Sequence, residues 1–309
     1  MQPSKLLCKR FMFSDSELYH YANTCPYRYK TYDIEKRNGG QRKISQPSKD
    51  LKAVQRYILS EFLDERIKIH DAAMAYRKGK GIVDNARKHI EQKYLLKMDF
   101  KDFFPSIISD DFMKILRSDE IVDNEREVKL LSKIFFMYDS GVLRLSIGSP
   151  GSPSISNAVM YNFDKLMSKK CLDSGVFYTR YSDDITFSSN IKDILFDWPD
   201  VVCEIIRDIG FPDLKINNNK TKFSSKKFNR HVTGITLSNQ GYPSIGREKK
   251  RLIRAKVFNV NNLDQSEILS LSGDISFARQ VEPNFIWRLW QKYPDKMALI
   301  IRNKEVYNK

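Results

Sequence analysis

The chain has 309 residues, of which 41% are hydrophobic and 12% aromatic, so it can bury a sizeable core and is not an intrinsically disordered protein. Its formal net charge of +15 at pH 7 favours a polyanionic partner, most of all nucleic acid, over a membrane surface. No signal-peptide core, no run of about 20 apolar residues and no zinc spacing among the scattered cysteines is present, which predicts a cytosolic protein with reduced thiols.

Strands and helices alternate along the first half of the chain. The patterns predict, in order, a helical lead-in over residues 1–25, a β-hairpin over 27–48, a helix from Leu51 to Leu63, a buried strand over 94–100, and helices around 110–117 and 125–138.

The second half ends in helices. The patterns predict a Gly/Pro/Ser loop at 146–154, a long helix ending near Lys170, two strand-like runs within 176–189, a helix around 191–208, a short strand at 231–238, and helices from about Gly246 onward. The sum is an α+β sheet domain followed by a helical subdomain. Two basic runs, 217–230 and 246–258, are either solvated faces or contacts to a polyanion.

Three aspartates stand at the ends of predicted strands. Asp183 and Asp184 interrupt a strand-like run, and Asp99 ends the run 94–100. Like charges repel, and burying one without a partner is costly. Mg²⁺ binds through a few carboxylates plus substrate phosphates, and two such ions can activate a hydroxyl and stabilise a leaving pyrophosphate. The aspartates therefore predict phosphoryl transfer on nucleotides. The alternative, turn or helix-capping residues, is our interpretation of Asp102 and Asp111.

An ordered set of motifs carries a family resemblance. "YSDD" at 181–184 resembles the Tyr-x-Asp-Asp box of reverse transcriptases, and the other blocks occur in the expected order: "RKISQPSKDLKAVQRYI" (42–58), "MDFKDFFPSI" (98–107), "GSPGSPSISN" (148–157), "NNNKTKF" (217–223) and "VTGITLS" (232–238). Within that family, "DNARKH" (84–89) and Val232-Thr233-Gly234 resemble the Asn-Ala-x-x-His and Val-Thr-Gly blocks of bacterial retron reverse transcriptases.

The resemblance implies a right-hand polymerase fold. The expected domains are a lead-in and fingers over 1–95, a palm of antiparallel sheet and helices over 96–240, with part of the fingers inserted around 110–150, and a helical thumb over 241–309. The resemblance also implies the metal ligands, Asp99, Asp183, Asp184 and the carbonyl of Phe100, which would hold two Mg²⁺ ions that Mn²⁺ can replace. Lys220 would protonate the leaving pyrophosphate.

Other residues are implied to bind the incoming dNTP. Arg42, with Lys43 as the competing choice, would clamp the triphosphate. Phe104 would exclude a ribose 2′-OH, unless it is a core aromatic. Gly148 and Pro150 would approach the nucleotide at a helix start. Ile147 departs from the family, where many relatives have Gln, which puts a side-chain hydrogen bond to the nucleotide in doubt.

A third group is implied to bind nucleic acid. Asn85 and His89 share a helical face by spacing, and the basic helix after Gly246 would grip phosphates; solvated or structural roles are the alternatives. The full group is Asn85, His89, Ser152, Thr233, Gly234, Arg247, Lys250, Arg251 and Arg254.

The implied function is RNA-templated DNA synthesis on the protein's own structured non-coding RNA. Synthesis would start from a 2′-OH of that RNA, leave a branched RNA–DNA product (msDNA), and serve antiphage defence with a separately encoded effector. One rival is another bacterial reverse transcriptase of the group II intron-like, diversity-generating or abortive-infection type. The other is a non-catalytic RNA-binding scaffold, against which the three intact aspartates argue.

Overall fold

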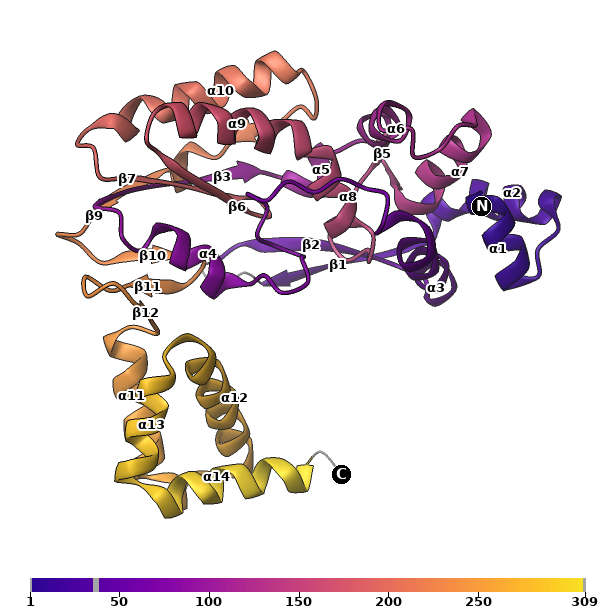
Figure 1. The fold of residues 1–309 in the computed structure, drawn as a ribbon. Coiled ribbons are helices and arrows are strands. Elements are labelled where there is room, and N and C mark those ends of the chain that lie inside the picture. Colours follow the sequence, from indigo (N-terminus) through magenta and orange to yellow (C-terminus); the bar gives the residue numbers. More distant parts are fainter. Residues whose placement is uncertain (1, 36–38, 308–309) are drawn as a thin grey trace.

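The structure is a computed structural model that describes residues 2–35 and 39–307 (Figure 1). The fingers begin with a helical lead-in, as predicted, and continue with the hairpin β1–β2, which pairs Tyr29 with Pro47 and Glu35 with Gln41. Their elements are α1 (Pro3–Phe11), α2 (Asp15–Thr24), η1 (Cys25–Tyr27), β1 (Tyr29–Glu35), β2 (Gln41–Pro47), α3 (Lys49–Ile58), η2 (Leu59–Leu63), α6 (Ser109–Ser118), α7 (Glu125–Phe135), β4 (Met137–Asp139) and β5 (Val142–Arg144).

The palm is an antiparallel sheet with helices packed on one face (Figure 1). Its strands run in the order β6-β7-β3-β8, and β9 also pairs with β3. The strands are β3 (Tyr94–Lys101), β6 (Phe177–Tyr181), β7 (Asp184–Ser189), β8 (Lys215–Ile216) and β9 (Lys222–Ser225). The helices are α5 (Phe103–Ser106), α8 (Ser152–Val159), α9 (Tyr161–Asp173), η3 (Ile194–Asp197), α10 (Trp198–Ile209) and η4 (Asn218–Lys220), and α4 (Ile82–His89) packs against β6.

Two helices in the structure differ from the sequence-based prediction. The pattern ending near Lys170 is two helices, α8 and α9, which meet at Met160, a turn residue with φ −79° and ψ −1°. The helix predicted around 191–208 begins as the 3-10 turn η3, and α10 starts at Trp198, where Pro199 suits the first helical turn.

The predicted strand 231–238 is a hairpin. Strands β10 (Arg230–Val232) and β11 (Ile235–Leu237) are joined by Thr233 and Gly234, whose φ angles are 47° and 79°. Positive φ at both residues is the geometry of a two-residue type I′ turn, which favours glycine. Strand β12 (Pro243–Ser244) completes this small sheet.

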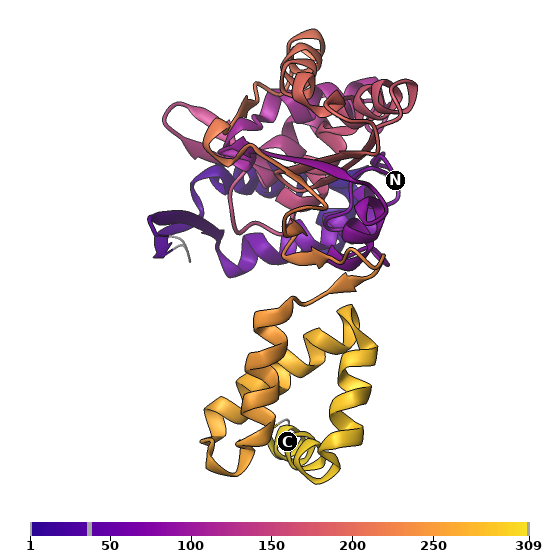
Figure 2. The ribbon, with the colours of Figure 1, turned by 90° about the vertical axis from the view of Figure 1, so that its left-hand side faces the viewer.

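The thumb is a bundle of helices set apart from the palm, beyond β12 (Figure 2). Its elements are α11 (Arg247–Phe258), η5 (Val260–Asn262), α12 (Gln265–Val281), α13 (Pro283–Lys292) and α14 (Pro294–Tyr307). None of the helices in the described ranges has the length and apolar composition needed to cross a bilayer.

Two hydrophobic cores hold the molecule together. The larger core joins the fingers to the palm sheet and its covering helices, with Phe187 stacked on Tyr178 and against Trp198. The smaller core fills the thumb and continues through β10–β12 to Ala86 in α4 and Ile90 at the end of that helix. Helix α4 therefore lies where the palm, the small sheet and the thumb core meet.

Candidate active site

The three predicted aspartates converge. Asp99 near the end of β3 pairs with Asp184 at the start of β7. Asp183 lies in the turn between β6 and β7, and its carbonyl accepts a hydrogen bond from the Phe100 amide at 3.0 Å. That turn places Ser182 at φ 61°. Neighbouring strands lie about 4.8 Å apart, so the paired carboxylates share one small volume.

The carboxylates repel one another. Burial first, and then the charge of Asp99, raises the pKa of Asp183. Burial, followed by the charges of Asp183 and Asp99, raises the pKa of Asp184 to about 6. Asp184 is nevertheless an exposed residue. The cluster carries negative charge that a cation would neutralise.

Lys220 is the resident counter-ion of this cluster. Its Nζ lies 2.8 Å from Asp99 Oδ2, and Asn217 Nδ2 donates to Asp99 Oδ1 at 3.3 Å. Partial burial lowers the pKa of Lys220, but the hydrogen bond to Asp99 and the three carboxylate charges raise it overall. Lys220 thus carries a proton at neutral pH and lies at the reacting centre.

The donor set fits a hard divalent cation. Carboxylate oxygens are the ligands that Mg²⁺ prefers, and Mg²⁺ usually keeps water or phosphate as its remaining ligands. Across the described ranges, no group of three or more His, Cys, Asp or Glu side chains forms a ready-made metal site. Because Lys220 occupies one oxygen of Asp99, a metal bound there would displace the ammonium.

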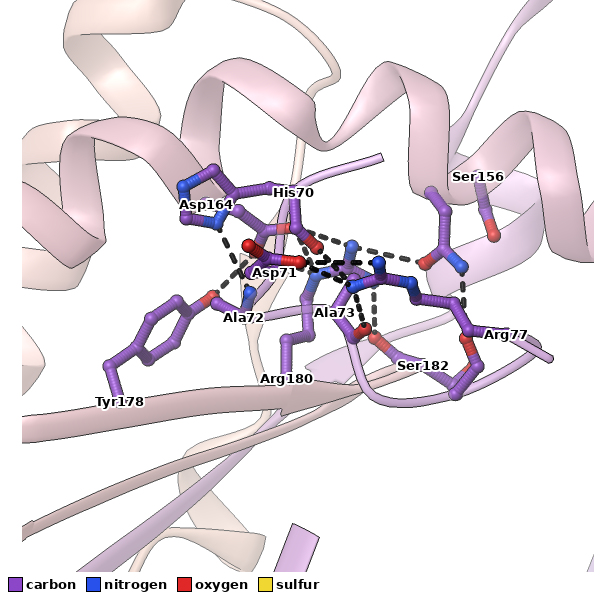
Figure 3. A network of polar contacts seen from close by, with 12 residues as sticks. His70, Asp71, Ala72, Ala73, Arg77, Ser156, Asp164, Tyr178, Arg180 and Ser182 are labelled. Atoms are coloured by element: carbon purple, nitrogen blue, oxygen red, sulfur yellow. Dashed lines mark hydrogen bonds and ion pairs between the residues drawn. The ribbon is translucent and has the colours of Figure 1, made fainter. Parts of the chain in front are cut away.

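A buried ion pair lies beside the turn between β6 and β7 (Figure 3). Arg180 and Asp164 are both fully buried, with Nη2 and Oδ2 2.7 Å apart. Arg180 Nη1 donates to the Ser182 carbonyl at 3.1 Å, and Nη2 donates to Asn157 Oδ1 at 3.1 Å. The hydroxyl of Tyr178 donates to Asp164 at 2.7 Å. The strained turn at Ser182 therefore rests on a charged network that links β6 to α8 and α9.

The fingers hairpin faces the aspartates. Arg42 lies exposed on β2, and its charge lowers the pKa of Asp183 against the dominant effect of burial. The Ser45 amide donates to the Ile147 carbonyl at 2.8 Å, so the backbone of Ile147 holds the hairpin whatever its side chain. Gly148, at φ 123°, lies so close that a Cβ would come within 3.1 Å of the Ser45 carbonyl. A side chain there would push the two loops apart.

Phe104 is half-buried at the edge of the core, beside Phe103. Its ring centroid lies 6.4 Å from that of Tyr76, whose hydroxyl donates to Ser182 Oγ at 3.2 Å. Tyr76 is 50% exposed at φ 60°. The two rings form an aromatic border next to the catalytic turn.

The prediction of a polar face open to RNA on α4 is wrong. Asn85 and His89 are 1% and 0% exposed. His89 bonds through its two ring nitrogens to Ser188 and Thr179, each at 2.7 Å. Asn85 accepts from Thr179 at 2.5 Å. Burial lowers the pKa of His89 to about 3, so the ring is neutral and fixes the position of α4 on the palm.

The same network reaches the Val-Thr-Gly turn. Asn85 Nδ2 donates to Thr233 Oγ1 at 3.5 Å, and that hydroxyl donates to the Ile82 carbonyl at 3.2 Å. Thr233 is half-buried and Gly234 is exposed. Residues 84–89 and 232–234 are therefore one structural unit, in which Asn85 and His89 are buried and Gly234 of the turn reaches solvent.

Two more residues that were predicted to contact nucleic acid have partners within the protein. Ser152 is 2% exposed and donates to the Ser146 carbonyl at 2.7 Å, so its predicted contact with nucleic acid is wrong. Lys250 forms an ion pair with Glu282 at 2.9 Å, which also accepts from Ser244. Lys250 therefore ties α11 to the end of α12 and to β12, while Arg247, Arg251 and Arg254 on the same helix are exposed.

Sequence reasoning missed several residues at the site. Lys97 lies two residues before Asp99 on the same face of β3; burial lowers its pKa, while the charge of Asp184 raises it. Alternation along the strand predicted at 94–100 could have placed Lys97 beside Asp99. No local pattern marks Tyr76, or the buried pair Arg180 and Asp164.

The comparisons with known proteins agree with the motifs. Residues 34–237 match the reverse transcriptase (RNA-dependent DNA polymerase) family. The Retron Ec83 reverse transcriptase of Escherichia coli is 43% identical over 281 residues, covering 89% of each chain. The Retron Ec73 reverse transcriptase of Escherichia coli is 34% identical, covering 85% of this chain and 86% of the relative.

Solved structures of low sequence identity are also similar. Telomerase from Candida albicans, in complex with a fragment of telomeric RNA, has a TM-score of 0.49 and 12% identity, covering 89% of this chain and 55% of that one. A foamy viral protease–reverse transcriptase in complex with double-stranded DNA has a TM-score of 0.45 and 16% identity. The match covers 82% of this chain and 36% of that one. The family match, the retron relatives and the helix-covered antiparallel palm confirm the predicted resemblance and fold class. The chain belongs to the bacterial retron reverse transcriptases, RNA-directed DNA polymerases of the right-hand α+β fold.

Proposed function

We propose that this reverse transcriptase copies its own structured non-coding RNA by two-metal phosphoryl transfer at Asp99, Asp183 and Asp184. The observation that carries the proposal is the pairing of Asp99 with Asp184 beside Asp183, in a cluster whose mutual repulsion calls for cations. The metals, Mg²⁺ or Mn²⁺, would supply Lewis-acid activation of the primer hydroxyl and of the leaving phosphate when bound. The carbonyl of Phe100 is the further ligand that the family motif implies.

The surrounding residues suit the remaining steps. Lys220 is protonated and reaches the carboxylates, which suits proton donation to pyrophosphate. Arg42 on the fingers would bind the triphosphate, and the loop at Gly148 and Pro150 would approach the incoming nucleotide. The Thr233-Gly234 turn would support the primer end. Arg247, Arg251 and Arg254 would grip the duplex through its phosphates.

The domain division follows from these roles. Fingers over 1–95 would close on the nucleotide, the palm over 96–240 would hold the aspartates, with part of the fingers inserted around 110–150, and the thumb over 241–309 would hold the duplex. As the resemblance to retron reverse transcriptases implies, synthesis would start from a 2′-OH within the RNA and leave a branched RNA–DNA product, and the enzyme would serve antiphage defence with a separately encoded effector. The RNA and the dNTPs are both made in the bacterial cytoplasm. We therefore propose that the enzyme works there.

One experiment tests the proposal as a whole. The purified protein is mixed with RNA transcribed from the DNA that flanks its gene, labelled dNTPs and Mg²⁺. We expect labelled DNA that stays attached to RNA and is released by an enzyme that cleaves 2′–5′ branches. DNA that is free from the outset would exclude 2′-OH priming, and no DNA at all would exclude the polymerase role on this RNA.

Phe104→Ala should relax sugar discrimination. The half-buried ring borders the catalytic turn without touching the carboxylates, so its removal opens space for a 2′-OH and leaves the metal ligands in place. We expect the preference for a dNTP over the matching rNTP to fall by about 10-fold or more, since lost contacts of about 1–3 kcal/mol change selectivity by about 10–200-fold. An unchanged ratio in an active, folded variant would make Phe104 a core residue only.

Two thumb arginines should set the salt dependence of duplex binding. Arg247 and Arg251 are exposed and, among the described residues, form no ion pair. Each lost phosphate contact lowers the slope of log affinity against log salt by about 0.7–0.9. Replacing both with Gln should therefore flatten the slope by about 1.4–1.8. The matched control is Lys169→Gln with Lys170→Gln on α9, which should leave the slope unchanged. Equal slopes for both variants would place the arginines on a solvated face.

A further inference from the structure

Three phenylalanine rings lie exposed at one rim of the palm. Phe196 in η3, Phe223 in β9 and Phe228 in the following turn are 59%, 43% and 71% exposed. The ring centroids of Phe196 and Phe223 lie 5.1 Å apart. We call these three residues the aromatic platform. Leaving three large apolar side chains in water is unfavourable, and exposed apolar patches of this kind mark interaction sites.

The aromatic platform surrounds a hollow of about 260 Å³. Tyr94 and Leu195 contribute to its walls, together with Ser224 and Ser225. The volume is below the range of about 300–1,000 Å³ that is typical of clefts for drug-sized ligands. An occupant that inserts one flat ring, and continues over the surface, suits it better than a free small molecule.

The platform lies outside the polymerase cleft. Tyr94 pairs with Ser225 and is five residues from Asp99 along β3, which at about 3.3 Å per residue places the hollow roughly 17 Å from the aspartates. Phe223 pairs with Leu96, a core residue, so it lies on the helix-covered face of the sheet. Lys97 and Asp99 point to the opposite face, because side chains alternate along a strand.

Cationic side chains border the platform. Lys226 and Lys227 form the turn between Phe223 and Phe228, and the Lys226 amide donates to the Lys93 carbonyl at 2.9 Å, which brings a third lysine to the same place. In the part of the chain that the structure describes, none of these three lysines forms an ion pair. Asp193, which also lines the hollow, has Lys192 as its partner at 3.7 Å.

Exposed rings bordered by lysines that form no ion pair in the described ranges match one class of ligand. Single-stranded nucleic acid offers a flat face on every base and a phosphate between successive bases, and proteins bind it with aromatic stacking platforms in basic grooves. An apolar protein surface would leave the lysines without partners. We propose that the aromatic platform binds unpaired nucleotides of the RNA partner, outside the polymerase cleft. This inference rests on the proposed function, because it assigns a second contact to the same RNA.

The test uses the full chain with its cleft already filled. The protein is first saturated with an annealed primer–template, and the probe is an oligouridine of about 12 nucleotides, within the 4–16 that single-strand sites cover. We expect the wild type to bind this probe. Phe196→Ala with Phe228→Ala should weaken binding by about 10- to 100-fold, since stacking contributes about 1–3 kcal/mol per base and 1.4 kcal/mol is tenfold. A blunt RNA duplex should bind both proteins equally.

The matched control is another exposed pair of rings. Tyr27 and Tyr138 are 68% and 46% exposed, with centroids 5.2 Å apart, and Tyr27→Ala with Tyr138→Ala should leave oligouridine binding unchanged. Lys226→Gln with Lys227→Gln should instead flatten the salt dependence by about 0.7 per lost contact with a single strand.

The outcomes separate this inference from the proposed function. Equal oligouridine affinity of the wild type and the phenylalanine variant overturns the inference, and so does a wild type that binds no probe once the cleft is filled. Either result would leave the platform to a protein partner. DNA synthesis on the annealed primer–template should be the same in the wild type and the variant. Its absence from the wild type would defeat the proposed function instead.

Discussion

Asp183→Asn is expected to abolish DNA synthesis while leaving RNA binding intact. The substitution keeps the size of the side chain and removes one charged ligand from the cluster formed with Asp99 and Asp184. Metal stabilisation of the transition state is worth several kcal/mol, so losing about 4 kcal/mol would lower the rate about 10³-fold. The measurement is primer extension with Mg²⁺, alongside RNA affinity at the same salt concentration.

Asp184→Asn should stabilise the folded protein even though it removes a metal ligand and lowers activity. The folded-state pKa of Asp184, about 6, is above the ordinary value of 3.8. A raised carboxylate pKa means that its contribution to folding is fully present below about pH 4 and is lost as the pH rises through about 6. Replacing Asp184 with Asn removes that loss. The metal-free variant should therefore unfold at a higher temperature than the wild type at pH 8, by a few degrees at most because the group is exposed.

The pH dependence supplies the control for this effect. Near pH 4 the wild-type carboxyl is protonated and the difference in unfolding temperature between wild type and Asp184→Asn should shrink.

Asp102→Asn is the matched substitution for activity, since Asp102 is exposed, makes no capping hydrogen bond, and has a φ of 47° that Asn accepts well. It should preserve activity at every pH. Full activity in Asp183→Asn, or lost activity in Asp102→Asn, would contradict the assignment of the metal ligands.

The position of the carboxylates could be predicted from the sequence because it depends on local patterns. A strand that ends in Asp and a pair of aspartates between two strand-like runs must meet if the strands pair, and Asp99 does pair with Asp184. The role of α4 could not be predicted in the same way. A spacing of four residues shows that Asn85 and His89 share a helical face, but not whether that face meets solvent or Thr179, about 90 residues away in the chain.

The ion pair between Arg180 and Asp164, which supports the catalytic turn, could not be predicted from the sequence for a related reason. Charged residues are almost never fully buried unless they are paired, so an arginine next to the Tyr-x-Asp-Asp box is expected at the surface. Arg180 is 0% exposed because Asp164, on a helix that packs over the sheet, supplies its counter-charge. Pairings of this kind depend on tertiary contacts and leave no periodic pattern in the sequence.

Arg180→Met is expected to destabilise the protein by about 3–5 kcal/mol, because it leaves Asp164 charged and buried without its partner. Among the described residues, Tyr178 would remain as the hydrogen-bond donor to the Asp164 carboxylate. The measurement is the free energy of unfolding in denaturant. The matched control is Lys249→Met, which breaks a partly exposed ion pair with Asp274 on the thumb and should cost about 1 kcal/mol or less.

Stability and activity should separate in the double variant. Arg180→Met with Asp164→Leu removes both buried charges, and well-packed apolar replacements of such pairs are often neutral or stabilising. We therefore expect most of the lost stability to return. DNA synthesis should stay about 10-fold or more below that of the wild type. The reason is that Ser182, at φ 61°, no longer has the Arg180 guanidinium on its carbonyl. A misplacement of about 1 Å at a catalytic group can cost about 10²-fold in rate.

The wild-type turn owes its shape to two different contacts of one side chain. Arg180 neutralises Asp164, which governs folding, and it holds the Ser182 carbonyl, which sets the direction of Asp183 and Asp184. Removing both charges restores only the first contact. Recovery of full activity together with stability in the double variant would show that the ion pair serves folding alone, and that the β6–β7 hairpin keeps its catalytic geometry without it.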